Sequence, residues 1–228
     1  MKRPATKEEV ESLYDNFARE HDINDYYRKS GFLIGFIEQR RLAIIKSLMN
    51  AKHGEKILEV GCGGGHVLSQ LREAALTGVD VSGEMLEKAR QNLAGANFEL
   101  LKGDIADVGL PDKSFDGIVC TEVLEHVLDP DHVLGHIKRL VKPSGRVVIT
   151  FPNDNLINGL KDLVKRSHLT ALPPFRRIGW GGDHYHFHVW SVREMRALLS
   201  RYFSVVDEAF APAAALPIRA CFLCVPRG

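Results

Sequence analysis

Glycines gather directly behind a short apolar run in this 228-residue chain. Four of them lie within residues 61–65, after residues 57–60, which have the apolar composition of a buried strand. Glycine permits a tight turn there and lets a ligand approach the backbone closely. A dinucleotide site would follow the pattern G-x-G-x-x-G, but His66 stands three residues after Gly63. The cluster therefore predicts either a ligand-binding loop of another kind or a plain turn between a strand and a helix.

Acidic residues stand at the ends of three successive apolar runs. Glu59 lies two residues before the first glycine, where a carboxylate would repel a pyrophosphate and attract a cationic ligand. Asp80 ends the second run and can accept both hydroxyl hydrogens of a ribose, or can cap the next helix, although Ser82 is better placed as a cap. Asp104 follows the third run, and with the apolar Ile105 it can hold the amino group and ring face of an adenine. This set fits an adenosine ligand, and Glu59 favours one that carries positive charge.

The segment 183–188 reads DHYHFH and is the other group of residues that can do chemistry. If the segment is extended, its three histidines share one face. One histidine can act as a general base or contact the substrate, or all three can be structural and hydrogen-bonded around a loop. They can also bind a divalent metal, since imidazole suits zinc and iron, but the sequence assigns no carboxylate partner. All three interpretations stay open, and no metal ligand is assigned.

Alternating patterns along the chain indicate which elements position these groups. From residue 56 to residue 151, short apolar runs alternate with helical segments, which implies parallel strands joined by crossover helices. Open sheets of this kind bind ligands at the carboxyl ends of their strands. The predicted strands are 57–60, 75–79, 97–101, 117–120, 146–151, 203–210 and 218–225, and the predicted helices are 6–19, 32–49, one through Val67, Leu68 and Leu71, 82–93, 130–140, 156–167 and 191–201. The predicted fold class is α/β.

Composition sets the broad class of protein. Hydrophobic residues make up 45% of the chain and charged residues 26%, so a sizeable core can form. The formal net charge is +1, without the basic excess that is typical of nucleic-acid binding. Four cysteines are too few for a disulfide scaffold, and Cys221 and Cys224 would point to opposite faces of a strand. Residues 1–10 carry no apolar signal segment and no run of 18 apolar residues occurs, so we expect a reduced cytoplasmic setting.

Taken in order, the motifs resemble those of the class I S-adenosylmethionine-dependent methyltransferases. The matching segments are YDNFA at 14–18, EVGCGGG at 59–65, VDVS at 79–82, KGD at 102–104, LP at 110–111 with SFD at 114–116, CTEVLEH at 120–126 and LVKPSGR at 140–146. The match is closest to the subgroup that includes the ubiquinone-type O-methyltransferases. It implies a Rossmann-like seven-stranded, mostly parallel sheet whose last strand is antiparallel. It also implies S-adenosyl-L-methionine as cofactor, with S-adenosyl-L-homocysteine as product.

The same resemblance implies roles for individual residues. It assigns Tyr14 and Phe17 to a lid over the cofactor. The methionine part of the cofactor is assigned to Glu59, Gly61, Cys62 and Gly63, with Thr121 and Glu122 at its edge. The ribose is assigned to Asp80, and the adenine to Val81, Met85, Asp104 and Ile105. Alternatively, Glu122, Glu125 and His126 form a solvated helix start. His188 lies in a recurring His-x-aromatic-Ser segment and takes a structural or pocket role, which leaves His184 and His186 as the better catalytic candidates.

We expect one domain with an insertion on the substrate side. Its parts are an N-terminal helical lid at 1–53, a cofactor-binding core at 54–151, an inserted lid at 152–190 and a C-terminal helix with two strands at 191–228. Arg176, Trp180 and His188 are the candidate substrate contacts. The basic amphipathic helix in the insertion can meet a membrane surface or an anionic substrate, or it can be an ordinary lid with a solvated face.

The sequence therefore predicts an enzyme that transfers a methyl group from S-adenosylmethionine to an oxygen or nitrogen atom of a small molecule. We expect a monomer or homodimer without a nucleic-acid partner. The alternatives are a membrane-associated quinone or lipid O-methyltransferase, an NAD-dependent oxidoreductase and a non-catalytic S-adenosylmethionine-binding module. Glu59 and the missing third glycine weigh against the oxidoreductase, and the intact acidic positions weigh against the non-catalytic module.

Overall fold

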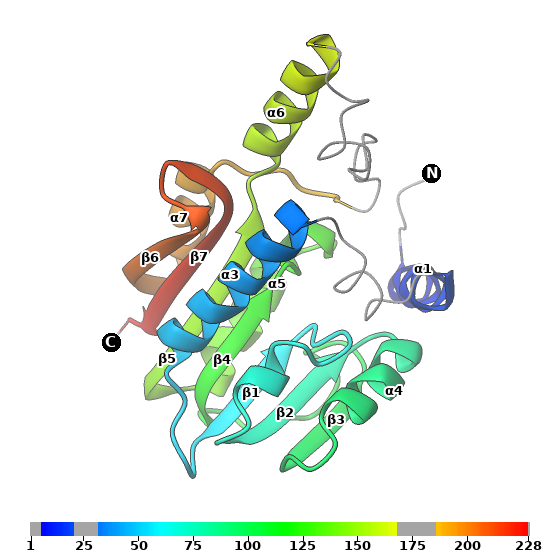
Figure 1. Cartoon of the computed structure of the whole chain (residues 1–228). Helices are drawn as coiled ribbons and strands as arrows, with labels where there is room; N and C mark the ends of the chain where they lie inside the picture. Colours follow the sequence, from blue (N-terminus) through cyan, green and yellow to red (C-terminus); the bar gives the residue numbers. More distant parts are fainter. Residues whose placement is uncertain (1–5, 21–31, 168–185, 228) are drawn as a thin grey trace.

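Seven strands form one mixed sheet, in the order β3-β2-β1-β4-β5-β7-β6 (Figure 1). The computed structural model describes residues 6–20, 32–167 and 186–227. The strands are β1 (Lys56–Val60), β2 (Ala75–Asp80), β3 (Phe98–Lys102), β4 (Phe115–Thr121), β5 (Val141–Pro152), β6 (Phe203–Ala213) and β7 (Leu216–Pro226). β1 to β5 pair in parallel, and β7 runs antiparallel to both of its neighbours. The predicted α/β class and the antiparallel last strand are confirmed.

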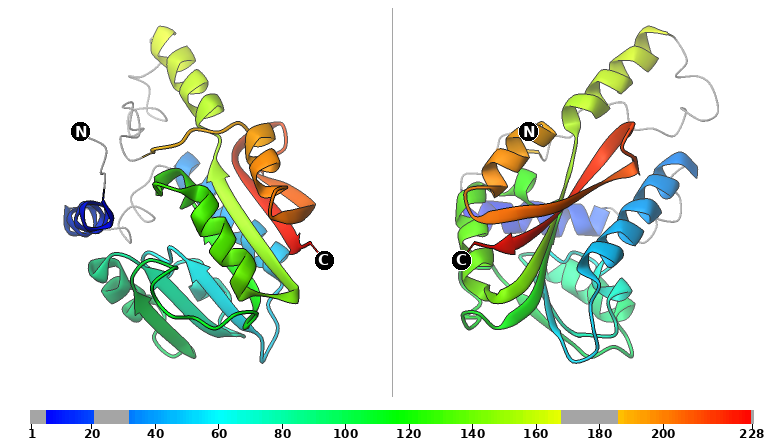
Figure 2. Two further views of the ribbon diagram at one scale, coloured as in Figure 1. Left: turned by 180° about the vertical axis from the view of Figure 1, so that it is seen from behind. Right: turned by 90° about the vertical axis from the view of Figure 1, so that its left-hand side faces the viewer.

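Helices cover both faces of this sheet because its central strands are apolar on both sides. Ile57 of β1 packs with α3 (Phe32–Met49) and α4 (Gly83–Asn92) in one hydrophobic cluster. Leu58 of the same strand packs in another cluster, with α5 (Pro130–Leu140) and α7 (Val192–Leu199). Figure 2 shows α3 on one side of the sheet and α5 and α7 on the other. Each fully buried aliphatic side chain stabilises the fold by about 1.5–3 kcal/mol.

The two cysteines of the C-x-x-C pattern lie on β7 and point to opposite faces, as predicted. Cys221 packs in a cluster with Ile37 of α3, and Cys224 packs in the cluster that contains α5. Both thiols are free, and burial raises the pKa of each to about 12. A thiol in such surroundings is inert, so the pair belongs to the core.

The predicted helix after the glycines is wrong. The structure has a single 3-10 turn there, η1 (Leu68–Gln70). Leu68 and Leu71 are both fully buried, so the turn points its apolar side chains into the core and the chain then returns directly to the start of β2. Apolar residues three apart satisfy one such turn as well as a longer helix, which is why the spacing alone misled the prediction.

The strand ends differ from the predicted ones where pairing continues past an irregularity. β5 begins at Val141 instead of residue 146, because Val141 pairs with Phe115 beyond a register shift in the β4–β5 ladder.

The remaining helical elements are α1 (Lys7–Glu20), the 3-10 turn η2 (Leu124–His126) and α6 (Asp154–Arg166). Helix α6 projects from the body of the protein (Figure 1). Among the described helices, none has the length and apolar composition needed to span a bilayer.

Candidate active site

The glycine loop folds over the carboxyl ends of β1 and β2. The backbone N–H groups of Gly61 and Cys62 both donate to the carbonyl of Val79, at 2.8 and 3.0 Å. The N–H of Gly63 donates to Oδ2 of Asp80 at 2.7 Å. These bonds fix the loop against the sheet. Glu59 is the penultimate residue of β1, two positions before the loop begins at Gly61.

Two glycines of the loop serve different purposes. Both have a positive φ, +69° at Gly61 and +48° at Gly63, which favours glycine. A Cβ at Gly61 would overlap Cγ2 of Val123, so this position is fixed by close packing. A Cβ at Gly63 would meet nothing within 4 Å, so the backbone there faces open space. Gly63 is therefore where a ligand can lie against the loop.

Glu59 carries a buried carboxylate that is only half satisfied. Its residue is 1% exposed, and the hydroxyl of Thr121 donates to Oε1 at 3.3 Å. Oε2 is buried and has no hydrogen-bond partner among the residues that the structure describes. Burial raises the pKa of Glu59 to about 8. A cationic group placed beside Oε2 would satisfy this oxygen and favour the ionised form.

Asp80 holds the loop and the start of the next helix. It accepts from the N–H of Ser82 at 2.9 Å as well as from Gly63, while burial raises its pKa. The side chain of Ser82 caps α4 by accepting from the N–H of Met85 at 3.2 Å. The cap is therefore Ser82, as the sequence favoured, and Asp80 faces the loop end of the site.

The predicted adenine contacts follow on β2, α4 and the loop after β3. Val81 is half-buried and Met85 is buried. Asp104 accepts from the N–H of Ala106 at 2.9 Å and forms an ion pair with Lys7 at 3.3 Å. The side chains of two further predicted contacts, Cys62 and Ile105, pack in the hydrophobic core. What those two residues offer to a ligand is their backbone.

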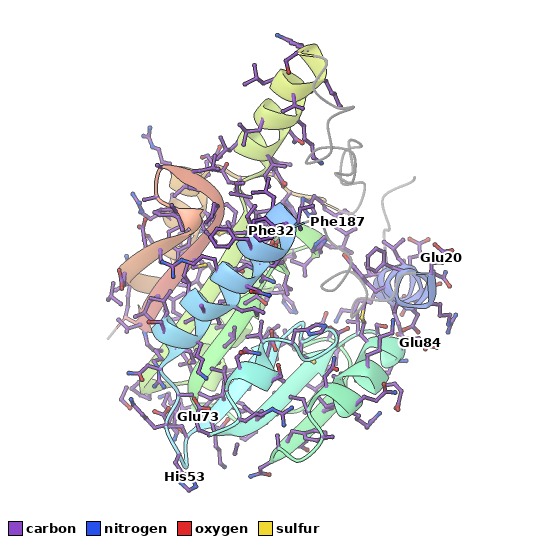
Figure 3. The ribbon with its side chains drawn as sticks, in the orientation of Figure 1. Glu20, Phe32, His53, Glu73, Glu84 and Phe187 are labelled. Carbon is purple, nitrogen blue, oxygen red and sulfur yellow. The ribbon has the colours of Figure 1, made fainter. Side chains whose placement is uncertain are left out.

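Helix α1 is tied to α4 by polar contacts. Oδ1 of Asp15 accepts from the hydroxyl of Ser82 at 2.5 Å and from the N–H of Glu84 at 3.4 Å. Nζ of Lys88 donates to the carbonyl of Ala18 at 2.6 Å. Nε of Arg19 donates to Oε1 of Glu84 at 3.1 Å, and Figure 3 labels Glu84 on α4 and Glu20 on α1. The two elements are thus joined by several polar contacts.

Tyr14 and Phe17, the residues predicted for a lid, are half-buried on α1. The ring of Tyr14 meets the ring of His126 edge-on, with 5.9 Å between their centroids. Because His126 belongs to η2, just after β4, α1 reaches from α4 to the end of β4. The lid role of Tyr14 and Phe17 stays a prediction.

A group of titratable side chains lies beyond β4. Nδ1 of His186 lies 2.7 Å from Oδ2 of Asp154, and its ring is T-shaped to the ring of His126 at 4.7 Å. Glu125 is 1% exposed, and neither carboxylate oxygen has a hydrogen-bond partner among the described residues. Burial, together with the carboxylate of Glu122, raises the pKa of Glu125 well above its usual range. The expectation of a solvated helix start is therefore wrong for Glu125.

Sequence reasoning did not foresee this grouping. Glu125 and His126 lie in the segment CTEVLEH, which the resemblance used only for its residues at 121 and 122. Asp154, the N-terminal residue of α6, carried no pattern at all. The pairing of His186 with Asp154 depends on where the chain returns after the insertion, and no local signal contains that information.

His188 makes contacts within the protein, while its predicted substrate role stays a prediction. Its Nε2 lies 3.0 Å from the carbonyl oxygen of Val127, and its ring stacks on Trp190. The N–H groups of Phe187 and His188 both donate to the carbonyl of Glu125, at 2.7 and 3.2 Å. His186 and His188 thus bind different partners. His184, Arg176 and Trp180 lie outside the described residues.

Glu122 faces the second half of the sheet. Its backbone has a φ of +53°, and its carboxylate accepts from the hydroxyl of Thr150 at 3.0 Å and pairs with Arg219 at 3.0 Å. Arg219 also pairs with Glu38 of α3 at 3.2 Å, and Glu38 pairs with Arg41. A buried chain of charges therefore ties the end of β4 to β7 and α3.

A cavity of about 310 Å³ opens elsewhere, at the amino ends of the strands. It is lined by the first residues of four strands, Lys56, Ala75, Phe98 and Phe115, among others. Ligands of open α/β sheets bind at the carboxyl ends of the strands. The cavity is therefore separate from the site described above.

Comparisons with known proteins agree with this geometry. A family model described as a methyltransferase domain matches residues 58–149. The ubiquinone biosynthesis O-methyltransferase of Idiomarina loihiensis is 32% identical over 153 residues, which are 64% of this chain and 60% of that protein. The protein of the same name from Vibrio vulnificus is 30% identical over 171 residues, 73% of this chain and 71% of that protein. The chain thus spans only 60% of the length of the Idiomarina relative.

The fold is shared with solved structures at lower identity. The crystal structure of the N-methyltransferase NodS from Bradyrhizobium japonicum, in complex with S-adenosyl-L-homocysteine, has a TM-score of 0.68 and 18% identity. The comparison covers 94% of this chain and 98% of that one. At this identity the likeness concerns the fold.

Proposed function

Since this chain belongs to the class I S-adenosylmethionine-dependent methyltransferases, we propose that it transfers a methyl group from S-adenosylmethionine to an oxygen or nitrogen atom of a small molecule. The relatives named ubiquinone biosynthesis O-methyltransferases support a hydroxyl group as the acceptor. The net charge of +1 supports a small molecule instead of a nucleic acid.

The observation that carries the proposal is the unsatisfied oxygen of Glu59. A carboxylate that is almost fully buried is costly unless a cation or hydrogen bonds compensate it. S-adenosylmethionine carries an ammonium group on its methionine part and a positive sulfonium. Oε2 of Glu59, on the strand that leads into the glycine loop, fits that ammonium group and does not fit a pyrophosphate.

The other site residues fit the rest of the cofactor. Asp80 stands at the end of β2, where a carboxylate suits the ribose hydroxyls. Val81 and Met85 supply apolar surface for the adenine, and Asp104 supplies a hydrogen-bond acceptor for its amino group. Tyr14 and Phe17 on α1 cover this edge and exclude water. The cofactor supplies a methyl group that is already activated by the positive sulfur.

What the protein has to add is alignment and exclusion of water. The ring of Tyr14 and the end of β4 at Thr121 border the space beyond the loop. We assign the acceptor to this space, next to His186. Asp154 fixes the orientation of the His186 ring through Nδ1, and in a ring held in this way Nε2 keeps the lone pair.

Thermal denaturation tests the proposal without knowledge of the acceptor. A ligand that binds only the folded chain raises the unfolding midpoint. S-adenosylhomocysteine should raise it, and NAD should not. The variant Asp80→Ala should lose the shift, while His132→Ala, on the exposed face of α5, should keep it. A chain that responds to NAD, or that shows no shift with S-adenosylhomocysteine, would contradict the proposal.

A further inference from the structure

Three side chains beyond β4 converge on one point. Glu125, His126 and His186 each offer a ligand atom, and these atoms all lie within 4.8 Å of one another. Glu125 and His126 are neighbours in η2, while His186 arrives from the far side of the insertion. Carboxylate and imidazole groups at such separations are the donor set of first-row transition metals.

The state of Glu125 distinguishes this cluster from ordinary surface groups. Its carboxylate is buried, and both of its oxygens are without hydrogen-bond partners among the described residues. Buried polar groups are normally hydrogen-bonded, and buried charges are normally paired or bound to a metal. Among the described residues, the carboxylate therefore lacks the hydrogen bonds that its burial requires.

His186 has the surroundings of a metal ligand. Metal-bound histidines usually donate their other ring N–H to a carboxylate, which fixes the tautomer and the ring orientation. Asp154 provides that carboxylate, 2.7 Å from Nδ1, and both side chains are 11% exposed. With Nδ1 donating to Asp154, Nε2 is the ring nitrogen that carries a lone pair and can therefore act as a metal ligand.

The backbone holds the two halves of the cluster together. The N–H groups of Phe187 and His188 donate to the carbonyl of Glu125, so the segment that carries His186 is fixed directly on η2. His188 adds a bond to Val127, at the end of the same turn. Main-chain hydrogen bonds thus fix the position of the segment that carries His186 relative to η2, which carries Glu125 and His126.

We propose that Glu125, His126 and His186 bind one divalent transition-metal ion, with Asp154 orienting His186. Two imidazoles and one carboxylate make three protein ligands, which is the pattern of catalytic sites that keep a position open for water or substrate. The ring of Tyr14 lies next to His126, so the cluster borders the space assigned to the acceptor. Metal binding itself does not depend on the proposed function; only the link to the acceptor rests on it.

A second pair of histidines has to be removed before the test. His132 and His136 lie one turn apart on α5, with 4.6 Å between their ring centroids. Two imidazoles in this arrangement can chelate a metal at the surface. The full chain with His132→Ala and His136→Ala is therefore the background in which binding at the cluster should be measured.

The test is titration of the chelator-treated background protein with Co²⁺, followed by visible absorption, with equilibrium dialysis against Zn²⁺ as a second measurement. We expect one equivalent to bind, with intense bands from a site of low coordination number. Glu125→Gln and His186→Ala should each weaken binding at least about tenfold, and Asp154→Asn about 10–100-fold. No saturable binding in the background protein, or unchanged binding in both ligand variants, would overturn the proposal.

Two controls separate the possible failures. Circular dichroism and the unfolding midpoint show whether each variant folds, and Glu125→Gln keeps the shape of the side chain. The midpoint shift with S-adenosylhomocysteine should persist in every variant, because none of these residues belongs to the cofactor site. A protein that shows this shift but binds no metal contradicts the metal site alone, whereas absence of the shift contradicts the proposed function.

Discussion

The hydroxyl of Thr121 donates to Oε1 of Glu59 at 3.3 Å, across the neighbouring ends of β4 and β1. This bond satisfies one carboxylate oxygen and leaves the other, Oε2, buried and without a partner in the described part of the chain. The fold therefore builds an incomplete acceptor at the point where the glycine loop begins. The first two predictions follow from it.

Cofactor affinity should depend on pH through Glu59. Its pKa is about 8, so the carboxyl group is mostly protonated at pH 7 and loses its proton when it meets an ammonium group. Affinity for S-adenosylhomocysteine should therefore rise from pH 6 to pH 8. Glu59→Gln should weaken binding by about 1.5–3 kcal/mol at pH 8 and remove most of the rise. Isothermal titration at several pH values measures both, and an equal pH profile in the two proteins would refute the role of Glu59.

The stability of the ligand-free protein should show the opposite trend. The pKa of Glu59 is raised from 4.5 to about 8 in the folded state, so the folded chain binds the extra proton between these values. Its stabilising contribution is complete below pH 4.5 and is lost as the pH rises through about 8. The slope is at most about 1.4 kcal/mol per pH unit. Urea unfolding at pH 5.5 and pH 8 should therefore show wild type losing more stability than Glu59→Gln.

Alanine at two glycines of the loop should separate packing from ligand contact. Gly61→Ala combines an unfavourable φ with overlap of Val123, and should lower the free energy of unfolding by about 2–4 kcal/mol. Gly63→Ala should lower the free energy of unfolding by only about 1 kcal/mol, because its Cβ enters open space. The same Cβ should obstruct the ligand, so the loss of binding free energy for S-adenosylhomocysteine should exceed this loss of stability. The idea fails if Gly63→Ala binds as wild type does.

The lid should hold the cofactor through Asp15. Asp15→Ala removes the bonds to Ser82 and Glu84 that fasten α1 to α4. Each such bond contributes about 0.5–1.5 kcal/mol, so the dissociation rate of S-adenosylhomocysteine should rise about 2–10-fold in stopped-flow displacement. Glu11→Ala, which breaks an exposed pair with Lys102, is the matched control and should leave the rate unchanged. Equal dissociation rates for wild type, Asp15→Ala and Glu11→Ala would contradict the proposal that α1 acts as a lid.

The two described histidines of the DHYHFH segment should behave differently. His186→Ala should lower turnover by about 100-fold or more while the S-adenosylhomocysteine midpoint shift remains. His188→Ala loses a bond to Val127 and its stacking on Trp190, so it should lower the free energy of unfolding by about 1–3 kcal/mol and retain most turnover. An acceptor is first found by screening hydroxylated aromatic compounds. Turnover is then measured as the formation of S-adenosylhomocysteine with that acceptor. Unchanged turnover in His186→Ala would exclude it from the acceptor side.

Most of the fold was predictable because its signals are local. Strand periodicity, the glycine cluster and the caps at Thr6 and Ser82 depend on residues a few positions apart, and the structure confirms them. The errors have the same origin. A single turn at η1 shares its apolar spacing with a helix, and the extension of β5 to Val141 depends on the partner strand.

By itself, the sequence determined the α/β sheet, the loop after β1 and the acidic residues at the ends of successive strands. Only the tertiary structure decided which distant side chains meet: Thr121 with Glu59, and Asp154 and His186 with Glu125 and His126. Contacts between residues far apart in the chain are set by packing and by where each connection returns. Burial also arises only on folding, so the raised pKa values of Glu59 and Glu125 belong to the folded chain and to no motif within it.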